Sequence, residues 1–277
     1  MNKIDILNIS VLHSFPENPF KVKVDEELCS LSESIKEYGV ITPIIVRKLK
    51  IGEYEVVAGH RRIKACEMAG IDKVPAIIRD MSKEEAVIAL VDSNIQRENI
   101  LPSERAFAYK MKLEAIRHQG KTSSQLATKL SLDEVGSHDN ISGDTVWRYV
   151  RLTNLNAEIL KLVDEKNIAL SPAVALSYLT NAEQNAVYEM MIELDCTPSY
   201  AQSIKMKNLS GQGELDIESI TKILSEIKPN QQEVYKFKRD EIRKFFPKNY
   251  SDKQIQETLL KLLEQWHKRR QRDRDSR

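Results

Sequence analysis

The sequence has 277 residues, of which 41% are hydrophobic, and this is enough for two or three domains rather than one. Its 42 basic and 41 acidic side chains nearly cancel, so the net charge alone does not indicate a nucleic-acid partner. Three widely spaced cysteines argue against a disulfide framework and a structural zinc site, and no apolar run approaches the ~20 residues of a membrane span. Since the first residues also lack a signal-peptide pattern, we expect a cytoplasmic protein without membrane contact.

Residues 1–100 mix helical and strand patterns and are expected to form one α/β domain. Asp25 precedes a run of apolar residues at helical spacing and Gly39 follows it, which predicts a helix between an N-cap and a C-cap. Two β-branched runs on either side of Gly52 predict a hairpin. The expected elements in chain order are a helix at 28–38, strands at 43–47 and 54–58, a helix at 60–69, a strand at 74–78 and a helix that opens with a capping box of Ser82 and Glu85.

Residues 101–228 carry mainly helical patterns and predict an all-helical domain. Ser103 is expected to cap its first helix. A short helix is expected at 121–130 and another after Ser142, with a polar connection of eight or more residues at 133–140 between them. A helix-turn-helix usually has a tight turn of about four residues at this point. The pair is therefore either an unusual helix-turn-helix or an ordinary helical hairpin.

Residues 229–277 begin with a linker-like polar stretch and end in a basic helix. From residue 231 onward there are 14 basic and 8 acidic side chains, whereas the preceding parts of the chain are slightly acidic. The helix has an apolar stripe made of Ile255, Leu259, Leu262, Leu263 and Trp266. Such a stripe suits pairing with a second copy, and the alternative is a solvated charged tail.

Gly59, His60, Arg61 and Arg62 stand where a predicted strand gives way to a predicted helix. Glycine lets a ligand approach the backbone closely, and the free N–H groups of the first helical turn attract anions. The two arginines could add bidentate contacts to phosphate. The same residues are equally compatible with an ordinary solvated helix start.

Several segments resemble the ParB family of DNA-partition proteins. Residues 59–65, GHRRIKA, resemble the family's GERRxRA box. In the expected order, residues 18–19 resemble the start of its first box, residues 39–47 its GVxQPIxVR stretch, and residues 94–98 its ENIQRE segment. Residues 121–130 resemble the TQEELAEKL opening of its DNA-binding unit.

The resemblance implies an α+β fold with a small mixed α/β ParB/sulfiredoxin-like domain at 1–100, a helical helix-turn-helix domain at 101–228 and a C-terminal helical segment at 229–277. It also implies that the first domain binds CTP and Mg²⁺, with the GERR segment at the phosphates and Asn94 near the metal. The nucleotide-binding residues carried over in this way are Thr42, Pro43, Gly59, His60, Arg61, Arg62 and Asn94.

The chain departs from the family pattern at positions that matter for hydrolysis. His60 replaces the glutamate of GERR, and Ser93 replaces the glutamate before the asparagine of ENIQR. A carboxylate there could hold magnesium or orient water, and serine does either poorly. The neighbouring Asp92 could partly substitute. We therefore expect CTP binding with weak or absent CTPase activity.

Sulfiredoxin shares this domain's fold and provides an alternative from a different enzyme class. Its chemistry needs a thiolate aimed at the ligand beside the arginine of the same turn. His60 occupies the corresponding position here, and Cys66 lies nearly two helical turns further on, at a spacing typical of a buried stripe. The sequence therefore does not favour sulfur chemistry.

In a helix-turn-helix the second helix meets base edges chiefly with its N-terminal residues, and the first crosses the phosphate backbone. The candidates for base or groove contact are Ser142, Asp144, Thr145 and Arg148. The candidates for phosphate contact are Thr122, Ser123, Ser124 and Gln125.

The resemblance to the ParB family implies a homodimeric protein that binds a specific site on double-stranded DNA as a CTP-regulated clamp. Its role would be segregation of a plasmid, chromosome or mobile element, together with a ParA-type partition ATPase and in association with the nucleoid or plasmid. The alternative is a ParB-like transcriptional regulator that binds DNA without using CTP.

Overall fold

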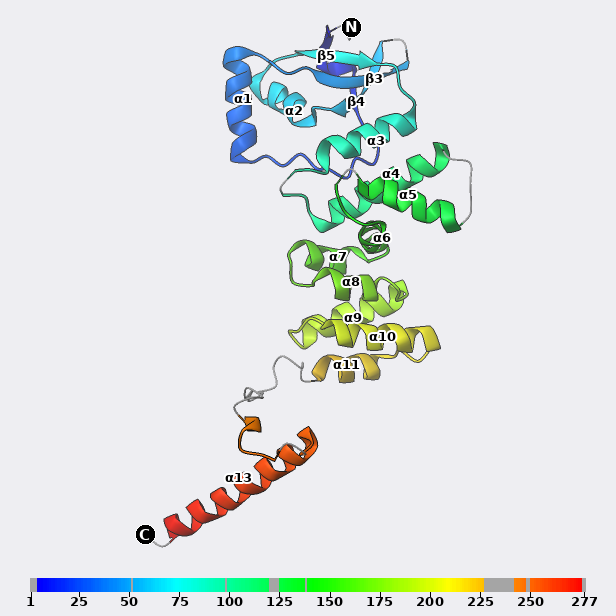
Figure 1. Cartoon of the computed structure of the whole chain (residues 1–277). Helices are drawn as coiled ribbons and strands as arrows, with labels where there is room; N and C mark the ends of the chain where they lie inside the picture. The colour runs from blue at the N-terminus through cyan, green and yellow to red at the C-terminus, as the bar shows by residue number, and fades with distance from the viewer. Residues whose placement is uncertain are drawn as a thin grey trace. The chain divides into compact units, whose positions relative to one another are not determined.

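The computed structural model describes residues 4–50, 52–97, 99–119, 125–137, 139–226, 242–247 and 250–275. The chain divides into two compact units, Met1–Glu226 and Ile227–Arg277, and each is described by itself. The first unit contains a sheet with three helices, followed by a series of helices (Figure 1). The expected α+β class is confirmed.

A five-stranded sheet has the order β1-β5-β3-β4-β2. The predicted hairpin is present, because β3 and β4 pair antiparallel, and β5 pairs parallel to β3. The first two strands were not predicted: β1 pairs antiparallel to β5 at one edge, β2 pairs parallel to β4 at the other, and only a short 3₁₀ turn at Ile9–Val11 connects them. The strands are β1 Ile4–Asn8, β2 Leu12–Ser14, β3 Ile44–Lys50, β4 Glu53–Ala58 and β5 Lys73–Arg79.

Helices cover both faces of the sheet because its central strands are apolar on both sides. Val56 and Val57, adjacent in β4, are both buried but belong to different core clusters. Val56 packs with residues of α1 (Glu26–Tyr38) and α2 (His60–Ala69), and Val57 packs with residues of α3 (Lys83–Asn94). The predicted caps are confirmed: the Asp25 side chain accepts the Leu28 N–H, and Ser82 and Glu85 form the capping box.

The helical part of the first unit begins with α4 (Pro102–Gln119), whose start differs from the prediction. Pro102 is the first helical residue, and Ser103 lies inside the helix rather than at its cap. The Ser103 hydroxyl and N–H donate to the Asp164 carboxylate at 2.6 and 2.8 Å. Proline suits a first helical position because the N–H it lacks would have no partner in the helix.

The predicted long connection between the two central helices is wrong. Helix α5 (Gln125–Ser137) continues through most of it, so the link to α6 (Gly143–Leu152) is only five residues long, 138–142. A Cβ on Gly136 would collide with the carbonyl oxygen of Ile141, so glycine here allows close contact rather than ending the helix. Asp133, expected in a loop, accepts the Gly143 N–H at 3.1 Å from within α5.

The remaining helices of this unit pack around one apolar core that includes Leu152, Ile159, Leu176, Met206 and Ile220. Most of them begin at a side-chain cap, such as Asn156, Thr180, Ser199 or Asp216. They are α7 Ala157–Asp164, α8 Leu170–Leu176, α9 Asn181–Glu193, α10 Tyr200–Gln212 and α11 Ile217–Ser225.

The second unit contains α13 (Asp252–Asp275), the long basic helix expected from the sequence (Figure 1). Much of its predicted apolar stripe is exposed: Leu262, Leu263 and Trp266 are 54 to 60% accessible, whereas Ile255 is buried. In the described part of the chain, no helix has the length and apolar character needed to cross a membrane.

Candidate nucleotide cavity and nucleic-acid interface

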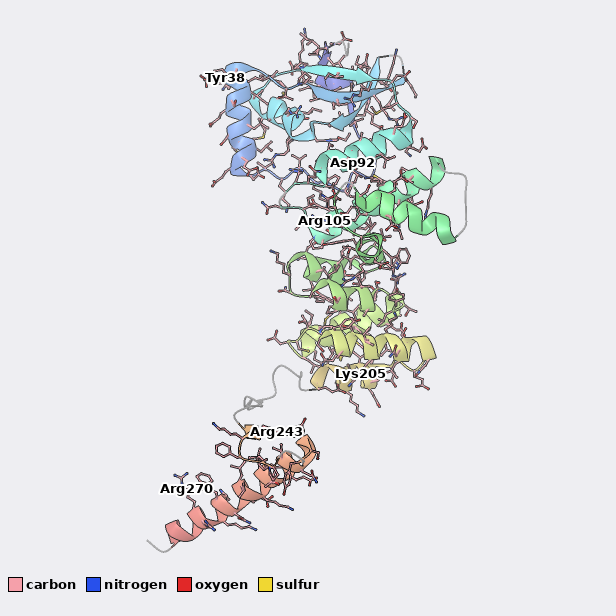
Figure 2. All side chains as sticks on the ribbon, in the orientation of Figure 1. Tyr38, Asp92, Arg105, Lys205, Arg243 and Arg270 are labelled. Atoms are coloured by element: carbon pink, nitrogen blue, oxygen red, sulfur yellow. The ribbon has the colours of Figure 1, made fainter. Side chains whose placement is uncertain are left out.

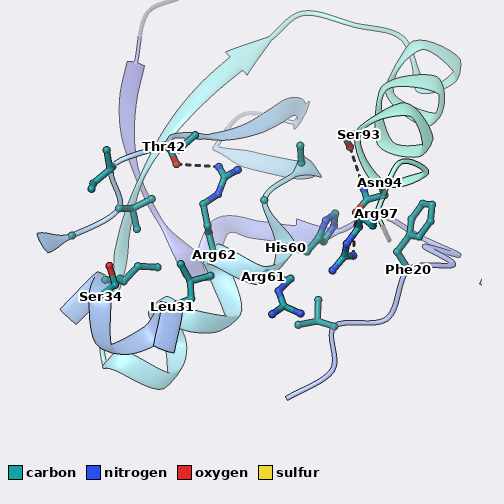
Figure 3. Close-up of a pocket in the computed structure, with 17 residues that line it drawn as sticks. Phe20, Leu31, Ser34, Thr42, His60, Arg61, Arg62, Ser93, Asn94 and Arg97 are labelled. Carbon is teal, nitrogen blue, oxygen red and sulfur yellow. Dashed lines mark hydrogen bonds between the residues drawn. The ribbon is translucent and has the colours of Figure 1, made fainter. Parts of the chain in front are cut away.

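A cavity of about 530 Å³ opens between α1, the loop before β3, the start of α2 and the end of α3 (Figure 3). This volume lies within the range of small-molecule sites. Pro43 does not line it, although its carbonyl holds a residue that does. The other six predicted nucleotide-binding residues all line it: Thr42, Gly59, His60, Arg61, Arg62 and Asn94.

Gly59 makes the turn from β4 into α2 possible. Its φ of 105° lies in the left-handed region, and an added Cβ would lie 2.6 Å from Ile44 Cγ2. No side chain caps α2, and the backbone N–H groups of His60 and Arg61 have no acceptor among the described residues. The helix start is therefore open to an anion, as the sequence indicated.

Arg61 is already engaged by carboxylates. Its guanidinium donates to both Asp25 oxygens at 2.8 and 2.9 Å and contacts Glu27 at 3.3 Å. The hydrogen bond from Arg61, with the one from the Leu28 N–H, holds the pKa of Asp25 below its usual value. Because Asp25 also caps α1, this pair fastens the start of α1 to the start of α2. Arg61 is therefore not freely solvated, and a phosphate could bind its guanidinium only in competition with these carboxylates.

Arg62 is held by neutral groups instead. It donates to the carbonyl oxygens of Thr42 and Pro43 at 3.0 and 2.7 Å, as Figure 3 shows for Thr42, and partial burial lowers its pKa. His60 also lines the cavity, on the side of Asn94 and Arg97 (Figure 3). Its Nε2 is buried without a hydrogen-bond partner among the described residues, and burial lowers its pKa, which favours the neutral ring.

The end of α3 contributes neutral oxygens to the cavity. Arg97, three residues beyond the helix, contributes a cation that the sequence did not lead us to predict. Ser93 Oγ and Asn94 Nδ2 both donate to the Leu90 carbonyl at 2.9 Å, while Asn94 Oδ1 accepts from Arg97 at 3.4 Å. Arg97 lines the cavity and is exposed. It belongs to the segment resembling ENIQRE, so the motif itself contained the signal.

No carboxylate is found among the described residues that line this cavity. Asp92, labelled in Figure 2, does not line the cavity. Its side chain accepts from Lys112 of α4 at 2.6 Å, and the Lys112 side chain is only 6% exposed. Mg²⁺ is usually held by one or two carboxylates together with substrate phosphates. Here Asn94 Oδ1 and Ser93 Oγ could only supplement oxygens that come from a ligand, so the chain by itself fits Mg²⁺ poorly.

Cys66 has no access to the cavity. It is fully buried in the core between α2 and the sheet, and burial raises the pKa of its thiol. A raised pKa disfavours the thiolate that sulfiredoxin-type chemistry needs. The structure therefore gives no support to that alternative.

The base-contact candidates come together at the N-terminal half of α6. Ser142 caps this helix, and Asp144 is exposed in its first turn beside Thr145. Arg148 follows one turn later and donates to Ser171 Oγ of α8 at 2.6 Å. The link to α5 is held by the Tyr109 hydroxyl, which donates to Asp139 at 2.7 Å. Three of the phosphate-contact candidates, Thr122, Ser123 and Ser124, lie outside the described residues. Gln125 is the first residue of α5, but its side chain is not among those that the structure describes.

Comparison with known proteins identifies the family. A family model described as the ParB N-terminal domain matches residues 1–95. The nucleoid occlusion protein of Bacillus anthracis is 30% identical over 232 residues, which cover 83% of this chain and 70% of that protein. The chain belongs to the ParB family. The resemblance found in the sequence is thereby confirmed.

Other ParB relatives match a shorter part of the chain. Stage 0 sporulation protein J of Bacillus subtilis is 36% identical over 181 residues, 64% of this chain and 58% of that protein, so the chain spans less than two thirds of that relative. A C-terminally truncated ParB of Caulobacter crescentus, solved in complex with CTP-γ-S, is 25% identical, covers 69% of this chain and 99% of its own, and has a TM-score of 0.32.

Proposed function

We propose that this ParB-family chain is a DNA-partition protein that binds a specific duplex site through α5 and α6 and a nucleotide, CTP, in the cavity at the start of α2. The observation that carries the proposal is the meeting of an uncapped helix N-terminus with Arg61, Arg62 and Arg97 around one cavity. Helix N–H groups and guanidinium forks are the usual partners of phosphate. The choice of CTP rests on the family.

The cavity has two kinds of wall, which suits a nucleotide. The arginines and the α2 N-terminus lie on the polar side, where a polyphosphate would bind. The remaining wall is mainly apolar and would pack against the ribose and base; it includes Phe20, Val22, Leu31, Ile35, Val40 and Ile41. Phe20 and Val22 follow closely on residues 18–19, which resemble the start of the family's first box.

Phosphate must compete with the protein's own carboxylates for Arg61. Asp25 and Glu27 already satisfy its guanidinium, so a triphosphate either displaces them or uses the N–H groups, Arg62 and Arg97 alone. Displacing Asp25 would also disturb the cap of α1. In both cases the nucleotide binds less favourably than it would if Arg61 were not paired with these carboxylates.

Hydrolysis should be very slow or absent, since the described lining has no carboxylate to hold magnesium or orient water. A magnesium ion would enter with the nucleotide, and Asn94 would provide a neutral ligand. The chain's release from DNA would then follow nucleotide dissociation rather than turnover. Phosphate release from CTP, stimulated by cognate DNA, would contradict this.

DNA binding is proposed for the exposed N-terminal half of α6, where Ser142, Asp144, Thr145 and Arg148 stand together. The candidates for phosphate contact remain Thr122, Ser123, Ser124 and Gln125. We also propose a homodimer paired through the exposed stripe of α13, and a ParA-type ATPase as partner on the nucleoid or plasmid.

The test combines calorimetry with DNA capture. Titration with CTP, in the presence and absence of bound DNA, should give heat that ATP does not give. Genomic DNA recovered with the protein should map to one compact cluster of sites. CTP heat equal to that of ATP would remove the clamp mechanism.

The engagement of Arg61 by Asp25 favours one other candidate, a ParB-family transcriptional regulator that does not use CTP. In that case Arg61 serves only to fasten α1 to α2. Recovered DNA spread over many promoters, without any CTP heat, would support this candidate instead.

A further inference from the structure

Two cations stack on one exposed aromatic ring just beyond α8. The Tyr178 side chain is 45% accessible, and Arg151 Cζ lies 3.9 Å from its ring centroid. Lys207 Nζ of α10 lies 3.7 Å from the same centroid. The separation of the two charged groups therefore cannot exceed the sum of these distances. Cation–π attraction holds both groups in place.

Neither cation is neutralised by a carboxylate among the described residues. Arg151 donates to the Ser177 hydroxyl at 3.2 Å and to the Ser177 carbonyl, both uncharged. Among the described residues, Lys207 has no partner besides the Tyr178 ring. Lys205, two residues earlier in α10, instead forms an ion pair with Glu226 at 2.5 Å. Two positive groups this close repel each other, and an anion that contacts both of them would relieve the repulsion.

Arg151 continues the side of α6 that carries Arg148, and this side faces α8. Arg151 follows Arg148 by one helical turn, and the two arginines bond to serines at opposite ends of α8: Ser171 near its start and Ser177 just after its end. We call Arg151, Tyr178 and Lys207 the cation strip. It extends from the proposed base-reading helix to α10.

An open hollow of about 810 Å³ borders the strip at Ser177. Its lining has amides and hydroxyls but no charged side chain among the described residues. Asparagine, serine and threonine commonly bond to the phosphates and sugars of DNA. The surface next to the strip therefore accepts a polyanion without electrostatic repulsion.

We propose that the cation strip binds the phosphate backbone of double-stranded DNA beside the site read by α6, independently of sequence. This rests on the proposed DNA binding by α6 and extends it to α8 and α10. Each DNA strand presents a charge about every 3.4 Å along the axis, so cations this close together can reach neighbouring phosphates. The alternative partner for these cations is an acidic protein surface, which the experiment below distinguishes from DNA.

The experiment compares the full-length variants Lys207→Ala and Lys205→Ala on a mixed-sequence DNA duplex by fluorescence anisotropy at several salt concentrations. Lys207→Ala should weaken binding roughly three- to tenfold at low salt and reduce the slope of log affinity against log salt by about 1. Its deficit should shrink about three- to fourfold when the salt is raised fourfold. Lys205→Ala should bind like the unmodified protein, because Glu226 already neutralises that charge.

A second pair separates the role of the ring from that of the fold. Tyr178→Phe keeps the aromatic face and should retain affinity, whereas Tyr178→Leu should lose it with little change in melting temperature. Equal affinities and slopes for Lys207→Ala and Lys205→Ala would overturn the proposal and leave an acidic protein as the partner. If the unmodified protein binds no duplex at all, the proposed function and the strip fail together.

Discussion

The cations of the nucleotide cavity and those of α6 are held in different ways. Arg61 is bonded to two carboxylates, whereas Arg148 and Arg151 are bonded to serines. An anion that approaches Arg61 must compete with charges that belong to the protein, but one that approaches α6 meets only neutral partners. Arg61 should therefore be reached only by a ligand of high charge density, whereas the helical surface should attract any polyanion.

The largest loss of stability is expected on substitution of Gly59, which shapes the nucleotide cavity and has no part in the surface of α6. Gly59→Ala forces a side chain into the left-handed region and against Ile44, and the combined cost should be about 2 to 5 kcal/mol of unfolding free energy. Denaturant unfolding measures this. The control Gly52→Ala has a φ of 81° but open space around its Cβ, and should cost only about 1 to 2 kcal/mol. Equal losses would mean that the contact with Ile44 is unimportant.

The next largest loss of stability is expected on substitution of Asp92, which links the end of α3 to α4 through its ion pair with Lys112. Asp92→Asn leaves the buried Lys112 ammonium without its counter-ion and should cost about 2 to 4 kcal/mol, less than a fully buried pair because Asp92 is partly exposed. Nucleotide affinity, measured by calorimetry below the unfolding range, should not change, because Asp92 does not line the cavity. A selective loss of nucleotide binding would return Asp92 to the site.

Substitution of Arg148 tests the proposed DNA-binding surface of α6. Arg148→Ala should reduce discrimination between selected and scrambled duplexes by about 1 to 3 kcal/mol if the arginine contacts a base bidentately. The duplex can be selected from a random library and the affinities compared at one salt concentration. Uniform weakening on both duplexes would assign Arg148 to phosphate contact, as proposed for the cation strip. No change would exclude α6 as the reading helix.

The smallest effect on stability is expected at Asp25, whose substitution removes the competitor of phosphate. Asp25→Asn keeps an N-cap acceptor but loses the charge that faces Arg61. Because the pair lowers the pKa of Asp25, its contribution is present above the ordinary value of about 4 and is lost as the pH falls through the lowered value. The stability difference between the two proteins should therefore narrow below about pH 4.

The same variant should bind nucleotide more tightly at neutral pH, by several-fold, since Arg61 is then free to contact phosphate. Glu26→Gln is the matched control: it removes a charge from the same first turn, and Glu26 forms no ion pair among the described residues. Weaker nucleotide binding by Asp25→Asn than by this control would show that the Asp25–Arg61 pair supports the nucleotide site instead of competing with phosphate.

Local chemistry made much of the fold predictable. Asp25 and Gly39 bound α1, and Ser82 with Glu85 opens α3, because caps act within a few residues of the backbone groups that they satisfy. The hairpin followed from β-branched runs around a turn glycine. The cavity residues came from a family pattern, and the structure gathers six of the seven in one place.

Distant pairings could not be predicted in this way. β1 depends on β5, where Ile4 pairs with Ile77, and nothing local requires Ile4–Asn8 to be extended. The partners of Arg61 and Lys112 lie 36 and 20 residues away, so neither pair was visible from spacing. The segment 133–137 resembled a loop because it is acidic and contains Gly136, but that glycine serves a contact across the turn.

The connection between β1 and β2 limits how the sheet can assemble. Four residue steps from Asn8 to Leu12 span at most roughly 14 Å, whereas the outer strands of a flat five-stranded sheet lie roughly 19 Å apart. The sheet must therefore curl until its two edges approach, and one short segment closes both. Because the partners of this segment lie far along the chain, it should dock late in folding, after the β3–β4 hairpin. Amide protons of β1 and β2 should then be the last of the sheet to gain protection from hydrogen exchange during refolding.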